Sequence, residues 1–117
     1  MTDGDEYSYG RLEVKYNNTW GTVCELGFTI VSANVVCRQL GFTRGAKAYY
    51  GGAQYGPGEG KIWLYNVRCN DIENNIAACP HSLWGQTPCT HAQDLSIECI
   101  KGKTYGSQYM VQFLLVI

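Results

Sequence analysis

Hydrophobic and polar residues alternate near the start of the chain. Leu12 and Val14 take every second position, and charged residues stand between and beside them. This period of two is typical of a strand with one buried face. Asn17 and Asn18 then interrupt the pattern, and asparagine tolerates the left-handed backbone of a tight turn. The pattern therefore predicts a β-hairpin whose second strand spans residues 19–24.

The spacing changes to that of a helix over residues 32–40, where apolar residues recur at intervals of four. Ser32, or Thr29 one turn earlier, can cap its free amide groups, and Gly41 can take the left-handed conformation that ends a helix. We expect this helix to turn an apolar face with one cysteine inward.

The rest of the chain contains shorter signals. Residues 61–69 and 95–100 read as strands, residues 72–79 as a short helix ended by Pro80, and the glycine-rich residues 51–60 as a surface loop. Strands around one or two helices without a βαβ rhythm predict an α+β domain. Its sheet should be mainly antiparallel, with one α-helix and a short second helix.

Length and composition set the domain boundaries. The 117 residues, 45% of them hydrophobic, suit one compact domain. Residues 1–9 are acidic and poor in aliphatic side chains, so we expect a flexible tail there and the folded domain at residues 10–101. Residues 102–117 form a C-terminal extension, whose apolar end is shorter than the roughly 20 residues of a membrane span. We expect it to pair as an extra strand, within the domain or in an oligomer.

An even number of cysteines indicates disulfide bonds and an oxidising, extracellular environment. No two of them have the close spacing of a structural zinc site. A zinc site made of Cys79, His81, Cys89 and His91 is the alternative, but it would leave the other thiols unused. Three disulfides are the simpler interpretation, and spacing alone allows fifteen pairings. The six cysteines are Cys24, Cys37, Cys69, Cys79, Cys89 and Cys99.

Charge and motifs argue against several functions. The net charge of -1 is not that of a dedicated nucleic-acid binder, and the glycine-rich loop lacks the lysine of a phosphate-binding loop. A hydrolase would need a nucleophile beside a base, for which His91 oriented by Asp94 is the candidate. The chain has no nucleophile-elbow motif around a serine. We therefore expect a protein that is not an enzyme.

Several motifs occur together in one order and are similar to those of one known family. They are Gly10-Arg11-Leu12-Glu13-Val14, Trp20-Gly21-Thr22-Val23-Cys24, Val35-Val36-Cys37-Arg38-Gln39-Leu40-Gly41-Phe42, Ile62-Trp63-Leu64, Ile76-Ala77-Ala78-Cys79 and the run from Cys89 through His91 and Asp94 to Cys99. Over residues 10–100 the chain resembles the scavenger receptor cysteine-rich (SRCR) domain, in its six-cysteine group A form.

The resemblance implies a curved antiparallel sheet that cradles a helix. It also implies which cysteines pair, namely Cys24 with Cys89, Cys37 with Cys99, and Cys69 with Cys79.

The resemblance further implies a calcium site, because many SRCR domains bind a divalent cation. The matching positions here read Glu25-Leu26, Tyr65-Asn66 and Gln93-Asp94. Calcium requires six or more oxygen ligands, and Leu26 supplies none. We expect a weak or lost site, with Glu25, Asn66 and Asp94 as its remaining ligands, and no other cofactor.

A recognition surface is the remaining possibility. Arg11, Glu13 and Lys15 share the outward face of the first strand, in a stretch that resembles the one family members use to bind bacterial surfaces. Five more basic residues could extend a patch that attracts polyanions. They are Arg38, Arg44, Lys47, Lys61 and Arg68. Asn17 begins an N-glycosylation sequon at the predicted turn.

These observations predict a non-catalytic extracellular ligand-binding module, secreted or part of a membrane protein's ectodomain. We expect it to recognise microbial or other polyanionic macromolecules in innate defence. The alternative is a protein–protein interaction module from an extracellular protease or a lysyl-oxidase-like protein, and a small secreted hydrolase comes third. Specific nucleic-acid binding and a membrane span in this chain are not expected.

Overall fold

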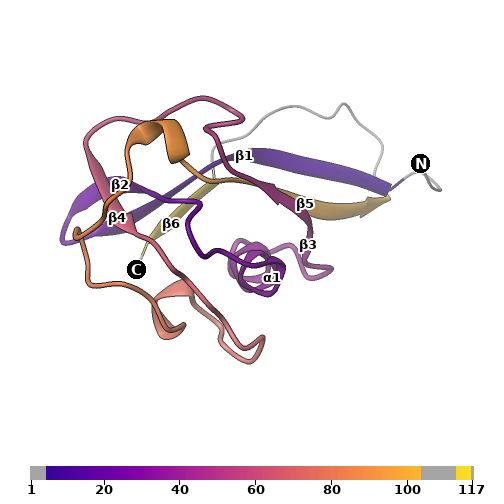
Figure 1. Ribbon diagram of the computed structural model, residues 1–117. Coiled ribbons are helices and arrows are strands. Elements are labelled where there is room, and N and C mark those ends of the chain that lie inside the picture. Colours follow the sequence, from indigo (N-terminus) through magenta and orange to yellow (C-terminus); the bar gives the residue numbers. More distant parts are fainter. Residues whose placement is uncertain (1–4, 104–112, 117) are drawn as a thin grey trace.

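The computed structural model describes residues 5–103 and 113–116, which form a curled six-stranded sheet around one helix (Figure 1). Strands β1 (Asp5–Tyr16) and β2 (Thr19–Val23) make the predicted hairpin. Its turn residues, Asn17 and Asn18, have φ angles of 51° and 64°. Two successive left-handed residues are the mark of a type I′ turn, so the hairpin is confirmed.

Strand β1 changes partners along its length. Its first half pairs with β5 (Ser96–Lys103), and its second half pairs with β2. Beyond these lie β3 (Ala46–Tyr50) next to β5 and β4 (Lys61–Leu64) next to β2. The sheet therefore curls, and the helix lies on its inner side (Figure 1). Most pairings are antiparallel as expected, but β4 runs parallel to β2, so the sheet is mixed.

Helix α1 (Ile30–Gln39) begins two residues before the expected start at Ser32. Thr29 is the cap, because its side chain accepts a hydrogen bond from the Ser32 amide. The Ser32 hydroxyl is buried instead between the Val67 carbonyl and the Cys69 amide, at 2.9 Å from each. Gly41, with φ of 100°, follows the end of the helix as predicted.

The predicted second helix over residues 72–79 is present in shorter form and is of the 3-10 kind. Only a 3-10 turn forms there, η1 (Ile76–Ala78), capped by the Asn75 side chain. Ile72 is exposed and makes no apolar face, so nothing holds a longer helix. A second 3-10 turn, η2 (His91–Gln93), was not predicted, although Thr90 caps it.

The expected flexible tail at residues 1–9 is corrected from Asp5 onward. Residues 5–9 belong to β1 and pair with β5, where Tyr7 lies opposite Ile100 and Tyr9 opposite Glu98. Backbone pairing with β5, together with two tyrosine rings, orders a segment that has few aliphatic side chains. Residues 1–4 lie outside the described part.

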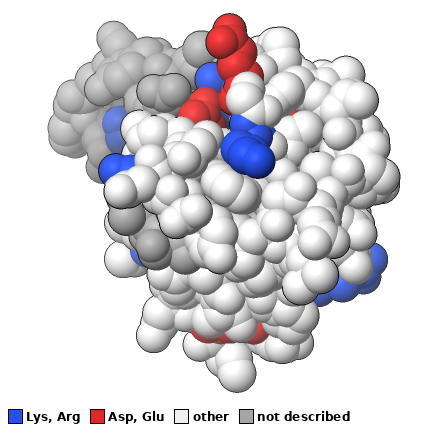
Figure 2. Space-filling view, turned by 90° about the vertical axis from the view of Figure 1, so that its left-hand side faces the viewer, with Lys and Arg blue, Asp and Glu red and all other residues white. Residues whose placement is uncertain are grey.

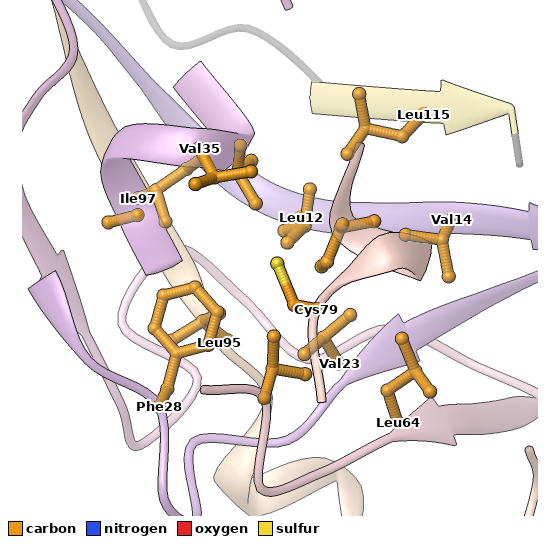
Figure 3. Packing of buried hydrophobic residues seen from close by; sticks show 14 of the residues in the cluster. Leu12, Val14, Val23, Phe28, Val35, Leu64, Cys79, Leu95, Ile97 and Leu115 are labelled. Carbon is orange, nitrogen blue, oxygen red and sulfur yellow. The ribbon is translucent and has the colours of Figure 1, made fainter. Parts of the chain in front are cut away.

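The C-terminal extension supplies an extra strand, as predicted. Strand β6 (Phe113–Val116) runs parallel to β1, with Leu12 opposite Phe113 and Lys15 opposite Val116. Leu115 is buried among the core side chains (Figure 3). The ordered fold thus extends past residues 10–101 at both ends. Within the described residues, no helix is long and apolar enough to cross a bilayer.

All six cysteines are paired, in the arrangement that the resemblance implied. The bonds join Cys24 to Cys89, Cys37 to Cys99, and Cys69 to Cys79. The second bond ties the inner face of α1 to β5, and the third closes the loop around η1. The core between helix and sheet is otherwise aliphatic and aromatic (Figure 3).

Removing the disulfides should destabilise the domain according to loop length. Replacing Cys37 and Cys99 together by alanine should cost about 4 kcal/mol, because that bond restricts a long loop in the unfolded chain. Replacing Cys69 and Cys79 together should cost about 1.5 kcal/mol less, since that loop is short. Urea unfolding measures both. The opposite order would contradict this account.

Leu115 should anchor β6. We expect Leu115→Asp to lower the free energy of unfolding by about 2–3 kcal/mol, because a carboxylate would replace a buried side chain. Leu114→Asp is the matched control in the same strand. Leu114 is 41% exposed against 4% for Leu115, and its substitution should cost less than about 1 kcal/mol. Equal effects in urea unfolding would show that β6 does not pack in this register.

Candidate functional site

The outer face of the sheet, which points away from α1, carries the first group of predicted residues. Leu12 and Val14 are fully buried, and Arg11, Glu13 and Lys15 alternate with them on the opposite side of β1. The prediction that these three share the outward face is therefore confirmed. Leu12 and Val14 belong to the core, so neither can contact a ligand.

Arg11 and Glu13 bind each other and the glycine-rich loop. The Arg11 Nε and Nη2 atoms donate to Glu13 Oε2 at 2.9 and 2.7 Å. Its Nη1 donates to the carbonyls of Gly56 and Pro57 at 3.1 and 3.3 Å. Both side chains are half-buried, and their charged atoms are already bonded within the fold. Their charges are therefore less available to a ligand.

Asp94 also bonds to the glycine-rich loop. This carboxylate is fully buried, and its Oδ2 accepts a hydrogen bond from the Gly58 amide at 2.7 Å. A β-carbon at position 58 would lie 2.6 Å from Thr22 Cγ2. The close approach of loop and sheet therefore requires glycine at this position.

His91 completes what we call the loop clamp, the set of Arg11, Asp94 and His91. Its Nδ1 lies 2.8 Å from Asp94 Oδ2, and its Nε2 lies 2.9 Å from the Gly60 carbonyl. Both partners are acceptors, so only the protonated ring can satisfy both. The hydrogen bond to Gly60 and the Asp94 carboxylate raise the pKa of His91, against the opposing effects of burial and Arg11.

This geometry does not suit catalysis. The Nε2 atom, with which a general base would take a proton from a nucleophile, faces a backbone carbonyl. His91 and Asp94 thus come together as the hydrolase alternative required, but they secure a loop.

Beside the loop clamp, tyrosines gather on the outer face in a group that the sequence analysis missed. We call Tyr9, Tyr50 and Tyr55 the tyrosine cluster. The ring of Tyr55 lies 4.7 Å from that of Tyr9 and 5.8 Å from that of Tyr50, measured between centroids. The Tyr50 hydroxyl donates to Glu98 at 2.8 Å, which raises its pKa to about 12. Burial, followed by Glu98, raises the pKa of Tyr55.

The register of three strands creates this cluster. Glu98 of β5 lies between Tyr9 of β1 and Ala48 of β3. Only the alternation of Tyr7 and Tyr9 was visible in the sequence, and β3 itself was not predicted.

The other predicted basic residues have separate local partners. Lys15 lies over Trp20, Lys47 over Tyr7 and Lys61 over Trp63, at 6.0, 4.6 and 5.6 Å from the ring centroids. Arg38, at the end of α1, pairs with Asp71 at 2.8 Å. Arg44 is exposed in the turn before β3. On the face shown in Figure 2, basic side chains form no continuous patch, and acidic side chains lie beside those in the upper part of the view.

The three expected calcium ligands each form hydrogen bonds with a different part of the chain. Glu25 accepts a hydrogen bond from the Gly52 amide at 2.5 Å, and Asn66 Oδ1 accepts one from Arg68 Nε at 2.9 Å. Asp94 belongs to the loop clamp. Among the described residues, one group has metal-ligand spacing, Cys69, Glu73 and Cys79, and its two sulfurs form a disulfide. The residues present do not fit a calcium ion.

Asn17 is exposed at the tip of the hairpin, where a glycan would meet solvent. Glycosylation there stays a prediction.

The loop clamp should weaken as the pH rises. Folding raises the pKa of His91. The contribution of His91 to the free energy of unfolding is therefore fully present below the ordinary histidine pKa, and it is lost as the pH rises through the raised pKa. Urea unfolding of the native protein should show lower stability at pH 9 than at pH 6, and His91→Gln should flatten this difference. His81→Gln is the control, and a flattening equal to that of His91→Gln would contradict the assignment.

Comparison with known proteins gives the family. The model of the scavenger receptor cysteine-rich domain matches residues 2–100. Lysyl oxidase homolog 2A of Danio rerio is 46% identical over 108 residues, and lysyl oxidase homolog 3A of the same species is 48% identical over 94 residues. These stretches cover 92% and 80% of this chain but 14% and 13% of the relatives, so the chain spans about one seventh of their length.

Two solved structures share the fold. The SRCR domain of mouse MARCO, in its dimeric form, has a TM-score of 0.74 and 39% identity, covering 80% of this chain and 88% of that one. The third SRCR domain of murine neurotrypsin has a TM-score of 0.70 and 38% identity, covering 78% and 84%. With its fold, its disulfides and most of its length matched, the chain belongs to the scavenger receptor cysteine-rich domain family.

Proposed function

We propose that this chain is a non-catalytic recognition module of a longer extracellular protein of the lysyl-oxidase-like type, and that it binds a protein partner through the outer face of its sheet. The sequence identity to lysyl oxidase homologs, of which the chain spans a small part, supports the proposal that it belongs to a longer protein of that type. The tyrosine cluster is the observation that supports binding of a protein partner.

Tyrosine suits this role for a physical reason. Its ring offers a large contact area, loses little conformational entropy on binding, and keeps a polar tip for water or a partner. In this chain Tyr55 is already held between Tyr9 and Tyr50, and the loop clamp holds the loop that carries it. The surface is therefore organised before a partner arrives, which lowers the cost of association.

Polyanion recognition in innate defence is the second candidate. The observation in its favour is that Lys15 and Lys47 extend over the rings of Trp20 in β2 and Tyr7 in β1. Against a strong polyanion site, Arg11 is paired with Glu13 and Arg38 with Asp71. A protein partner therefore agrees better with the outer face than a microbial polyanion does.

Site-specific photocrosslinking tests the proposed function. A photoreactive phenylalanine analogue at position 55 of the parent protein should crosslink to an extracellular protein, since that side chain lies in the tyrosine cluster. Tyr49, the residue before Tyr50 in β3, is the matched control position, because its ring packs against Phe28 and the core. Equal crosslinking from positions 55 and 49, or none from position 55, would contradict the proposal.

Salt separates the two candidates. Crosslinking from position 55 should persist when the salt is raised from about 0.1 M to about 0.5 M, because aromatic burial is hardly screened. Retention on heparin or lipopolysaccharide should be weak and should fall steeply over that range. Strong retention that Lys15→Gln and Lys47→Gln abolish would favour the polyanion candidate instead.

A further inference from the structure

A second surface lies away from the tyrosine cluster, where residues 24–27 and 64–68 run side by side. The Cys24 amide donates to the Leu64 carbonyl at 2.9 Å, and the Asn66 amide donates to the Leu26 carbonyl at 2.7 Å. Asn66 has φ of 57°, and its Oδ1 would lie 2.2 Å from a β-carbon at position 27. The side-chain amide of Asn66 is thus fixed directly above Gly27.

Arg68 forms a hydrogen bond with this side-chain amide. Its Nε donates to Asn66 Oδ1 at 2.9 Å, and its backbone amide donates to the Pro80 carbonyl at 2.9 Å. The next residue, Cys69, is crosslinked to Cys79. Within residues 5–103 and 113–116 the two Nη atoms have no hydrogen-bond or ion-pair partner, and the side chain is exposed. A guanidinium held at its inner edge therefore presents its outer edge to solvent.

This arrangement conflicts with a cation at the same place. The Asn66 oxygen that a calcium ion would need already accepts a hydrogen bond from a positive group, and an ion beside Arg68 would be repelled. Leu26 adds no oxygen, and Glu25 bonds to the loop at Gly52. The positive charge at this position belongs to the protein itself.

Exposed leucines lie on the two segments that bond to residues 65–66. The segment at residues 65–66 bonds to Leu26 on one side and to Ser82 on the other, where the Ser82 amide donates to the Tyr65 carbonyl at 3.1 Å. Leu26 and the neighbour of Ser82, Leu83, are 40% and 70% exposed. We define Arg68, Leu26 and Leu83 as the Arg68 surface. One fixed positive charge, with exposed leucines on the neighbouring segments, suits a single carboxylate with apolar neighbours better than a chain of sulfates.

We propose that the Arg68 surface binds an acidic side chain of a protein partner directly, without calcium. The two Nη groups can donate to both oxygens of a carboxylate in the fork geometry that makes such pairs strong. Leu26 and Leu83 contact the apolar residues beside that carboxylate. This surface is distinct from the outer face, so it does not require the crosslinking at position 55.

Nuclear magnetic resonance of the disulfide-bonded domain tests the proposal. The probe is a capped peptide with one glutamate between two leucines, and its glutamine analogue is the control ligand. The Arg68 Nε–Hε signal and the methyl signals of Leu26 and Leu83 should shift saturably with the glutamate peptide, equally in calcium and in chelator. Arg68→Gln should weaken binding about tenfold. Arg38→Gln, which removes the same charge elsewhere, should not.

The proposal would be overturned by equal binding of both peptides, by no shift at Arg68 with the glutamate peptide, or by a calcium-dependent shift of the Asn66 side chain. A shift caused by a heparin hexasaccharide and not by the peptide would also overturn it, in favour of a glycan. As a complementary test, Leu26→Asp combined with Arg68→Gln should create calcium affinity that the native chain lacks, measured by calorimetry. Tyr55→Ala should leave the peptide titration unchanged, which separates this proposal from the proposed function.

Discussion

The covalent link between the helix and the sheet is the constraint on which this fold depends. Through Cys37 and Cys99 the buried face of α1 is fixed to β5, and through Cys24 and Cys89 the end of β2 is fixed to the segment before η2. A domain of this size buries a modest core, and crosslinks that restrict the unfolded chain add to it. Long connections without regular structure can then be retained, and these connections contribute to the surfaces described above.

Charge is used inside the fold as much as on its surface. Arg11, Asp94 and His91 all bond to one loop, and Glu13 neutralises Arg11. A basic residue counted in a sequence is therefore a poor guide to a binding patch, because its partner decides whether its charge is available. In this chain Arg68 keeps an exposed edge, whereas Arg11 does not.

Local signals in the sequence predicted much of this structure. The asparagine turn and the alternation around Leu12 correctly predicted the hairpin, and the cap at Thr29 was foreseen as an alternative. The pairing of cysteines came from the family resemblance, since spacing alone left it open. Features that depend on distant partners were missed: the order of residues 5–9 needs β5, the tyrosine cluster needs the register of β1, β5 and β3, and the loop clamp needs a glycine-rich loop folded onto the sheet.

The parallel direction of β6 has a consequence for any chain of which this module is a part. Strand β1 starts at one end of the sheet, and β6 runs the same way along its far half, so the polypeptide arrives at one pole and departs at the other (Figure 1). Segments that continue from these two strand ends would therefore be held apart by the length of the sheet.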